Sequence, residues 1–104
     1  MSIKLERLGH IFTEEISKII QTELSDETIG MVSITYTKIS SDLSYAKVYF
    51  TALDIEKKKE IEDKLNKASK FIRNNLFDRV EIRKMPELTF VYDESVEYGN
   101  KIEH

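Results

Sequence analysis

Apolar residues recur along the first part of the chain at the spacing of an α-helix. Between residues 3 and 24 they fall three or four positions apart, and polar side chains occupy the opposite face. The pattern predicts one long amphipathic helix, and the polar residues 25–28 with Gly30 are expected to connect it to the next element. The predicted apolar stripe consists of Leu5, Leu8, Phe12, Ile16 and Ile19, widened by Ile11, Ile20 and Leu24.

Two segments then change to the two-residue alternation that is typical of β-strands. They span residues 31–39 and 44–53, and both are rich in β-branched and aromatic side chains. Only a short polar turn at 40–43 separates them, so we expect an antiparallel hairpin in which Asp42 hydrogen-bonds its own backbone. The apolar faces of the two strands are predicted to hold Val32, Ile34, Tyr36, Ala46, Val48, Phe50 and Ala52.

A second helical region with one interruption precedes a last strand. Asp54 is a suitable N-cap, and the apolar stripe that follows consists of Ile61, Leu65, Ala68, Ile72 and Leu76. The small residues Ala68 and Ser69 lie where the polar face becomes wholly basic, so a bend or the close approach of another backbone is expected at this point. After Pro86, residues 88–92 are predicted to form a third strand.

The element order is therefore α-β-β-α-(kink)-α-β, an α+β fold with a three-stranded sheet and helices packed on one face. The length of 104 residues fits a single domain, which we place at 1–99, with 100–104 as a frayed tail.

Composition excludes several classes of site. The absence of cysteine rules out disulfides, thiolate metal sites and cysteine nucleophiles, and two distant histidines leave no basis for a histidine metal site or a serine–histidine triad. The three glycines are isolated, so no phosphate-binding glycine loop exists, and Asp93-Glu94 is expected to be a solvated pair rather than an acid–base pair. Apolar runs are too short to span a membrane, and the N-terminus does not resemble a signal peptide. The sequence predicts a cytoplasmic binding protein, without enzymatic activity, metal or cofactor.

The charge of the chain is segregated along its length. The formal net charge is −3, but residues 57–84 hold ten basic and five acidic side chains, whereas the segments before and after are both acidic. Basic side chains spaced along a helix and its following loop can each meet a phosphate and thereby fix the orientation of a nucleic acid. A lysine-rich helix that is merely solvated remains an alternative.

Three tyrosines, Tyr45, Tyr49 and Tyr92, could place rings on one face of the sheet for stacking with bases. Cross-strand pairs of aromatic and β-branched side chains account for the same pattern, and the sequence favours that interpretation.

Four segments of the chain, in the right order and at the right separations, resemble the bacterial ribosome-binding factor A family. They are Glu15-Ile16-Ser17-Lys18-Ile19-Ile20-Gln21, Ile39-Ser40-Ser41-Asp42-Leu43-Ser44-Tyr45-Ala46-Lys47-Val48-Tyr49, Asn66-Lys67-Ala68-Ser69-Lys70-Phe71-Ile72-Arg73 and Pro86-Glu87-Leu88-Thr89-Phe90-Val91-Tyr92-Asp93-Glu94-Ser95. The resemblance implies a type II KH fold, in which a kinked helix pair, often with alanine and glycine two positions apart, replaces the usual glycine-rich loop. Here Ala68 matches that pattern, and Lys70 stands at the position of the glycine.

The resemblance also implies a function. It predicts a non-enzymatic, monomeric assembly factor that binds the free small ribosomal subunit and its rRNA, alongside assembly GTPases acting on the same particle. The factor would assist late maturation, including processing of the 5′ end of the rRNA precursor, with a defect on its loss that worsens in the cold. The alternative is an α+β protein-interaction module whose basic helix binds an acidic protein without RNA contact. The predicted RNA-binding residues are Lys67, Ala68, Ser69, Lys70, Arg73, Arg79, Arg83 and Lys84.

Overall fold

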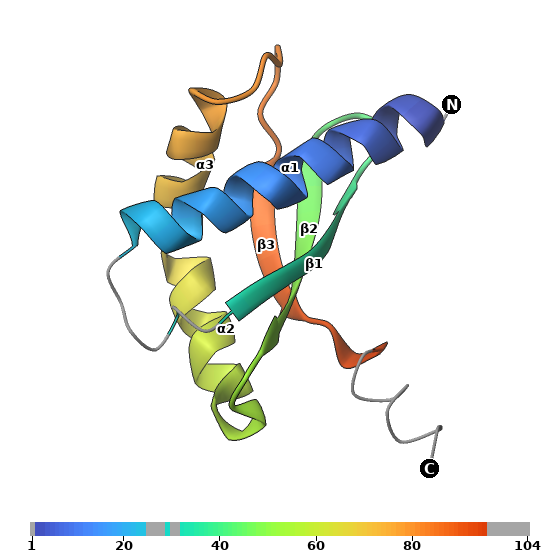
Figure 1. The fold of residues 1–104 in the computed structure, drawn as a ribbon. Coiled ribbons are helices and arrows are strands. Elements are labelled where there is room, and N and C mark those ends of the chain that lie inside the picture. Colours follow the sequence, from blue (N-terminus) through green and yellow to red (C-terminus); the bar gives the residue numbers. More distant parts are fainter. Residues whose placement is uncertain (1, 25–28, 30–31, 96–104) are drawn as a thin grey trace.

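Three helices and one three-stranded sheet make up the part of the chain that the computed structural model describes, residues 2–24, 29 and 32–95 (Figure 1). The predicted order of elements and the α+β, KH-like fold class are confirmed. The expected connection at 25–28 with Gly30 and the tail at 100–104 lie outside the described residues. In chain order the elements are α1 (Ser2–Glu23), β1 (Val32–Ile39), β2 (Tyr45–Ala52), the 3₁₀ turn η1 (Ile55–Lys57), α2 (Lys58–Lys67), α3 (Ser69–Phe77) and β3 (Glu87–Tyr92).

The sheet has the strand order β1-β2-β3, with β1 and β2 antiparallel and β2 and β3 parallel. The β1–β2 turn is closed as the sequence predicts, because the Asp42 carboxylate accepts hydrogen bonds from the Ser44 backbone N–H at 3.0 Å and from the Ser40 hydroxyl at 2.9 Å. Asp54 accepts from the Glu56 N–H at 3.1 Å and so begins η1, the short turn that leads into α2.

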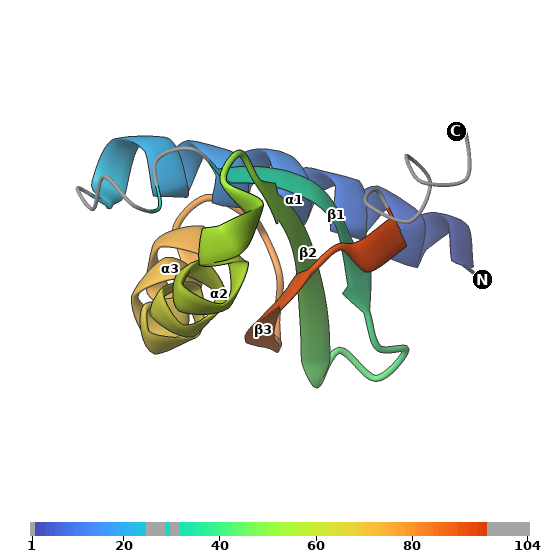
Figure 2. The same cartoon turned by 90° about the horizontal axis from the view of Figure 1, so that it is seen from below.

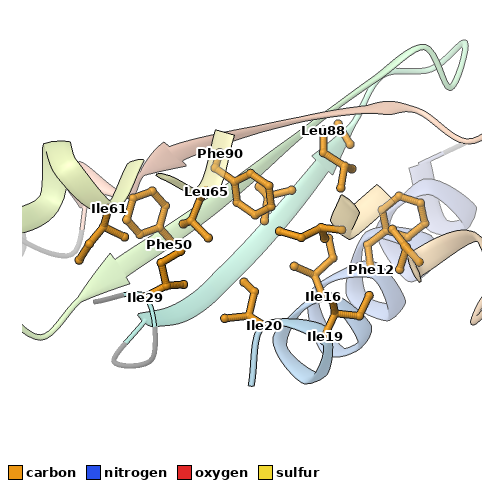
Figure 3. Close-up of a cluster of buried hydrophobic side chains, with 14 of the residues drawn as sticks. Phe12, Ile16, Ile19, Ile20, Ile29, Phe50, Ile61, Leu65, Leu88 and Phe90 are labelled. Atoms are coloured by element: carbon orange, nitrogen blue, oxygen red, sulfur yellow. The ribbon is translucent and has the colours of Figure 1, made fainter. Parts of the chain in front are cut away.

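The helices lie against one face of the sheet, and the opposite face is covered by no element of the described chain (Figure 2). Figure 3 shows Phe50, Leu65 and Phe90 meeting in the core between the sheet and the helices, and all three are almost fully buried. The predicted apolar stripes of the helices supply this core with one exception. Ile11 is 40% exposed, because it lies at the margin of the α1 stripe rather than within it.

A β-bulge at Thr35 reverses the alternation along β1. Ile34 is opposite Phe50 and Tyr36 is opposite Tyr49, so Thr35 has no partner across the ladder. Thr37 is therefore buried and Tyr36 lies on the uncovered face, 47% exposed. The prediction that Tyr36 lies on the apolar face with Val32 and Ile34 is wrong for this reason.

Candidate nucleic-acid interface

The helical region breaks at a single residue, Ala68, between α2 and α3. The Ala68 N–H donates to the carbonyls of Lys64 and Leu65, each at 3.1 Å, and its own carbonyl accepts from the Ile72 N–H at 2.9 Å. Hydrogen bonding is thus kept on both sides of the break at Ala68, and Figure 1 shows α2 and α3 as two segments joined end to end. The predicted kink is present. Lys70 lies within α3, and Leu43 is the only non-glycine residue of the described chain with positive φ, so this kink does not require a glycine at position 70.

A groove of about 440 Å³ lies beside the kink, between the α2–α3 junction and the start of β3. Of the predicted site residues, the structure brings Lys67, Ser69, Lys70 and Arg73 to this groove. Its lining is completed by Asn66, Glu87 and Leu88. Ala68 marks the kink itself, so the central part of the predicted site forms one continuous surface.

The groove walls are electropositive. Lys67 and Lys70 are both exposed, and neither forms an ion pair with another described residue. Glu87 is the one acidic side chain among the described residues that line the groove. Two ammonium groups without an acidic partner, beside a concave surface, are suited to binding phosphate groups.

Arg73 builds one wall of the groove. Its Nε donates to the Pro86 carbonyl at 3.0 Å and its Nη2 donates to the Met85 carbonyl at 2.7 Å. These two bonds tie α3 to the segment that enters β3, where Met85 and Pro86 are buried. Arg73 therefore has a structural role that the sequence did not reveal, and it adds positive charge to the groove.

A strand edge forms the other side of the groove. The Asn66 side chain pairs with the backbone of Phe90, donating to its carbonyl at 2.9 Å and accepting from its N–H at 2.8 Å. One turn earlier, Glu62 accepts from the Tyr92 N–H at 3.0 Å. Backbone groups alternate in direction along a strand, so the N–H and C=O of Leu88 point to the same edge as those of Phe90. Asn66 covers the backbone of Phe90, whereas the part of the edge at Leu88 faces the groove.

Sequence reasoning did not assign any role to Glu62, Asn66 or Leu88. One signal was available, because Glu62 and Asn66 are four residues apart and must share a helix face. Nothing local indicates, however, that this face meets the backbone of a strand 24 to 30 residues further along the chain.

The remaining predicted residues lie outside the groove. Arg79 reaches α1, with Nη1 at 3.4 Å from Glu15 Oε1 and Nη2 at 3.9 Å from Glu23 Oε2. The Lys84 ammonium donates to the Ser44 hydroxyl at 3.1 Å, beside the β1–β2 turn, and Arg83 is exposed in the segment before β3. The structure thus separates the basic residues into a groove group and a dispersed group.

Two exposed phenylalanines adjoin the basic residues on α3. Phe71 is 44% exposed and Phe77 is 54% exposed, and together with Lys70 and Asn74 they occupy one side of the helix. Aromatic rings beside lysines can stack with unpaired bases while the lysines meet the phosphates. Phe71 and Phe77 lie outside the predicted apolar stripe of this helical region, but spacing alone indicates no binding role for them.

The pair Asp93-Glu94 is not the solvated pair that the sequence led us to expect. Asp93 is buried, and it accepts hydrogen bonds from the Thr35 hydroxyl at 2.7 Å and from the Ser95 hydroxyl at 2.5 Å. Burial by itself raises the pKa of Asp93, but the hydrogen bonds from Ser95 and Thr35 outweigh it and hold the pKa below its ordinary value. Asp93 is thus a charged hydrogen-bond acceptor that binds the side chain of Thr35, the residue at the β-bulge.

The described part of the chain has neither a cluster of metal-ligating side chains nor a membrane-spanning helix. Residues 2–24, 29 and 32–95 contain no cluster of three or more His, Cys, Asp or Glu side chains arranged to hold a metal ion. No helix in the same residues has the length and apolar character needed to cross a membrane.

Known proteins resemble this chain in both sequence and fold. The family profile described as Ribosome-binding factor A matches residues 4–104. Ribosome-binding factor A of Staphylococcus epidermidis is 45% identical over 103 residues, which cover 98% of this chain and 89% of the relative. The crystal structure of ribosome-binding factor A from Thermus thermophilus has the same fold, with a TM-score of 0.78, 23% identity and coverage of 85% of this chain and 94% of that one. The Thermus thermophilus coordinates fitted into the cryo-EM map of a complex of the factor with 30S give a TM-score of 0.73 at 22% identity, covering 86% and 96% of the two chains. The chain belongs to the ribosome-binding factor A family.

Proposed function

We propose that this protein is a non-enzymatic assembly factor that binds the free small ribosomal subunit and its rRNA. It assists late maturation, including processing of the 5′ end of the small-subunit rRNA precursor, and acts in the cytoplasm as a monomer. The observation that supports this most directly is membership of the ribosome-binding factor A family over nearly the whole chain. Assembly GTPases acting on the same particle are further proposed partners.

The groove at the helix kink is the proposed contact with rRNA. Lys67 and Lys70 lie on its rim and can each meet a phosphate, which fixes the register of the RNA without reading its sequence. The outward backbone groups of Leu88 can hydrogen-bond a base edge, and Phe71 offers an exposed ring next to Lys70. This division of roles suits an unpaired stretch of RNA rather than a regular duplex.

Sedimentation of cell extract tests the partner. The protein is expected to migrate with free small subunits and not with joined ribosomes, and to leave the particle as the salt concentration rises, because phosphate contacts depend on counterion release. Migration at the top of the gradient at every salt concentration would contradict the proposal. Salt-sensitive binding that survives ribonuclease digestion of the rRNA would instead support an acidic protein as the partner of the basic helix, because attraction between exposed charges is screened by salt whatever the anion.

Depletion of the protein tests the role in maturation. We expect precursor rRNA with unprocessed 5′ ends and an excess of free subunits. The defect is expected to grow at low temperature, because misfolded RNA helices rearrange more slowly there. Normal subunit profiles and mature rRNA ends at both temperatures would contradict a role in assembly.

A further inference from the structure

The face of the sheet that no described helix covers has a regular pattern of aromatic and basic side chains. Along β2 the outward residues are Tyr45, Lys47 and Tyr49, and along β1 they are Tyr36 and Lys38. The register aligns them in rows, with Tyr36 opposite Tyr49 and Lys38 opposite Lys47. The bulge at Thr35 creates this arrangement, because without the extra residue Tyr36 would point into the core.

The tyrosines form a stacking surface. The rings of Tyr36 and Tyr49 lie nearly parallel, 4.5 Å apart between centroids and inclined by 11°. Tyr45 stands two residues before Lys47 and is 62% exposed, more than any other aromatic side chain of the described residues. A shallow hollow of about 220 Å³ lies along these side chains. Its lining consists of Lys38, Ile39, Ser40, Tyr45, Lys47 and Tyr49.

The lysine row is unfavourable for the fold by itself. Lys38 and Lys47 are direct cross-strand neighbours, and like charges in that position destabilise a sheet. Neither lysine forms an ion pair with a residue in the described part of the chain, and the β3 residue beside Lys47 is the neutral Thr89. Glu87, opposite Tyr45, is the nearest acid in the ladder. A ligand with negative charges would remove the repulsion that the fold tolerates.

We propose that this sheet face, defined by Tyr36, Lys38, Tyr45, Lys47 and Tyr49, is a second RNA-binding surface that takes a single-stranded segment. Bases stack on the Tyr45 ring and on the Tyr36–Tyr49 pair, and phosphates lie against Lys38 and Lys47. The inference rests on the proposed function in taking RNA as the ligand. It goes beyond that function because none of these residues lines the groove at the helix kink.

The alternation itself favours RNA over a protein ligand. A protein interface is typically depleted of lysine at its centre, whereas here two lysines lie between the aromatic side chains. A single-stranded nucleic acid presents flat bases and a charge on every nucleotide, and so matches both features of the surface at once.

Binding of a labelled oligonucleotide tests the surface directly. The ligand is a fluorescein-labelled oligouridylate of about ten nucleotides, which is within the usual site size for a single strand. Its binding is measured by fluorescence anisotropy. The protein carries Lys67→Ala and Lys70→Ala, so that the groove contributes little to binding. In this background Tyr45→Leu is expected to weaken binding about 5- to 150-fold, the range for loss of one stacked base, whereas Tyr45→Phe keeps the ring and should bind within about two-fold of its parent. Lys38→Ala/Lys47→Ala should reduce the log–log salt slope by about 1.4, since each contact with a single strand contributes about 0.7.

The same substitutions are also made in a protein with an intact groove, and binding of these variants to isolated small subunits is measured. This second measurement distinguishes failure of the second RNA-binding surface from failure of the proposed function. Equal affinity of Tyr45→Leu and Tyr45→Phe for the oligonucleotide, or no binding in the groove-deficient background, would overturn the second surface. Cosedimentation of the wild-type protein with small subunits would in that case leave the proposed function standing. Weaker subunit binding by Tyr45→Leu with unchanged oligonucleotide binding would show that the face meets a protein, which also overturns the RNA assignment.

Discussion

Gly9 of α1 lies directly against the backbone carbonyl of Thr37 in β1, so closely that a methyl group on Gly9 would be 2.5 Å from that oxygen. The contact is reinforced by Thr13, whose hydroxyl donates to the Gly9 carbonyl at 3.0 Å and lies 3.0 Å from the Thr37 hydroxyl. Helix α1 and strand β1 thus come closest at Gly9, which has no side chain. This close contact lets the apolar stripe of α1, including Phe12, pack on the sheet.

Gly9→Ala is expected to destabilise the protein, although alanine is the better helix former by about 1 kcal/mol. The added methyl group meets backbone, which cannot rotate away, and overpacking of this kind costs about 1–3 kcal/mol. Thermal unfolding followed by circular dichroism measures the effect, with Gln21→Ala on the exposed face of α1 as the control. A melting temperature for Gly9→Ala at or above the wild-type value would contradict this, since the contact with Thr37 would then cost no more than alanine gains as a helix former.

Asn66→Ala should lower the free energy of unfolding by about 2–4 kcal/mol, because it leaves both the N–H and the C=O of Phe90 without their partner. Asn75→Ala is the matched control, since among the described residues its side-chain amide donates to the Phe71 carbonyl of its own helix, at an exposed position. Urea denaturation of both variants makes the comparison. Similar losses for the two would contradict a special role for Asn66 at the β3 edge.

Arg73→Ala is expected to cost about 1.5–3 kcal/mol of stability, because a charged donor is removed from two backbone carbonyls. Arg73→Lys should recover only part of this, since an ammonium group cannot reproduce the two-pronged geometry. Lys70→Ala, at an exposed neighbouring position, should remain within about 0.5 kcal/mol of wild type. Chemical denaturation of the three variants decides the matter, and an Arg73→Ala protein as stable as Lys70→Ala would refute the structural role.

Lys67→Ala and Lys70→Ala should each flatten the log–log salt dependence of small-subunit binding by roughly 0.7 to 0.9, the contribution of one phosphate contact. Arg79→Ala should leave the slope unchanged, because its guanidinium is already engaged with Glu15 and Glu23. Binding isotherms at several salt concentrations separate these cases. Equal slopes for all three variants would mean that the groove lysines are simply solvated.

Asp93→Asn should lose stability at neutral pH but not in acid. The folded-state pKa of Asp93 lies below its ordinary value of 3.8, so the charged carboxylate stabilises the fold above that pH and the contribution disappears as the pH falls through the folded-state pKa. We expect a deficit of about 1–3 kcal/mol near neutral pH, the usual range for a hydrogen-bonded charged group, shrinking as the pH falls below the ordinary pKa. Glu94→Gln, at an exposed ion pair, is the control. A deficit for Asp93→Asn that is constant across this range would contradict the assignment.

The amino-acid sequence by itself determined the elements, their order and the kink. Helical and strand spacing identify which side chains must be buried together, and a stripe such as that of α1 or β2 can be buried only against another apolar face. The small residues Ala68 and Ser69 similarly indicated the interruption between α2 and α3, because small side chains and the change of charge at this point are visible within one helical turn of sequence. The basic groove was partly accessible for the same reason, since Lys67, Lys70 and Arg73 are neighbours on one helical segment.

Only the tertiary structure decided what those charged and aromatic side chains meet. The partners of Arg73, Asn66 and Arg79 lie 13, 24 and 64 residues away in the sequence, and no local pattern encodes such distances. One unpaired residue in β1 likewise moved Tyr36 from the core to the surface and set it against Tyr49. Burial of apolar stripes depends on spacing along the chain, whereas a hydrogen bond or an ion pair depends on where two distant segments are brought together.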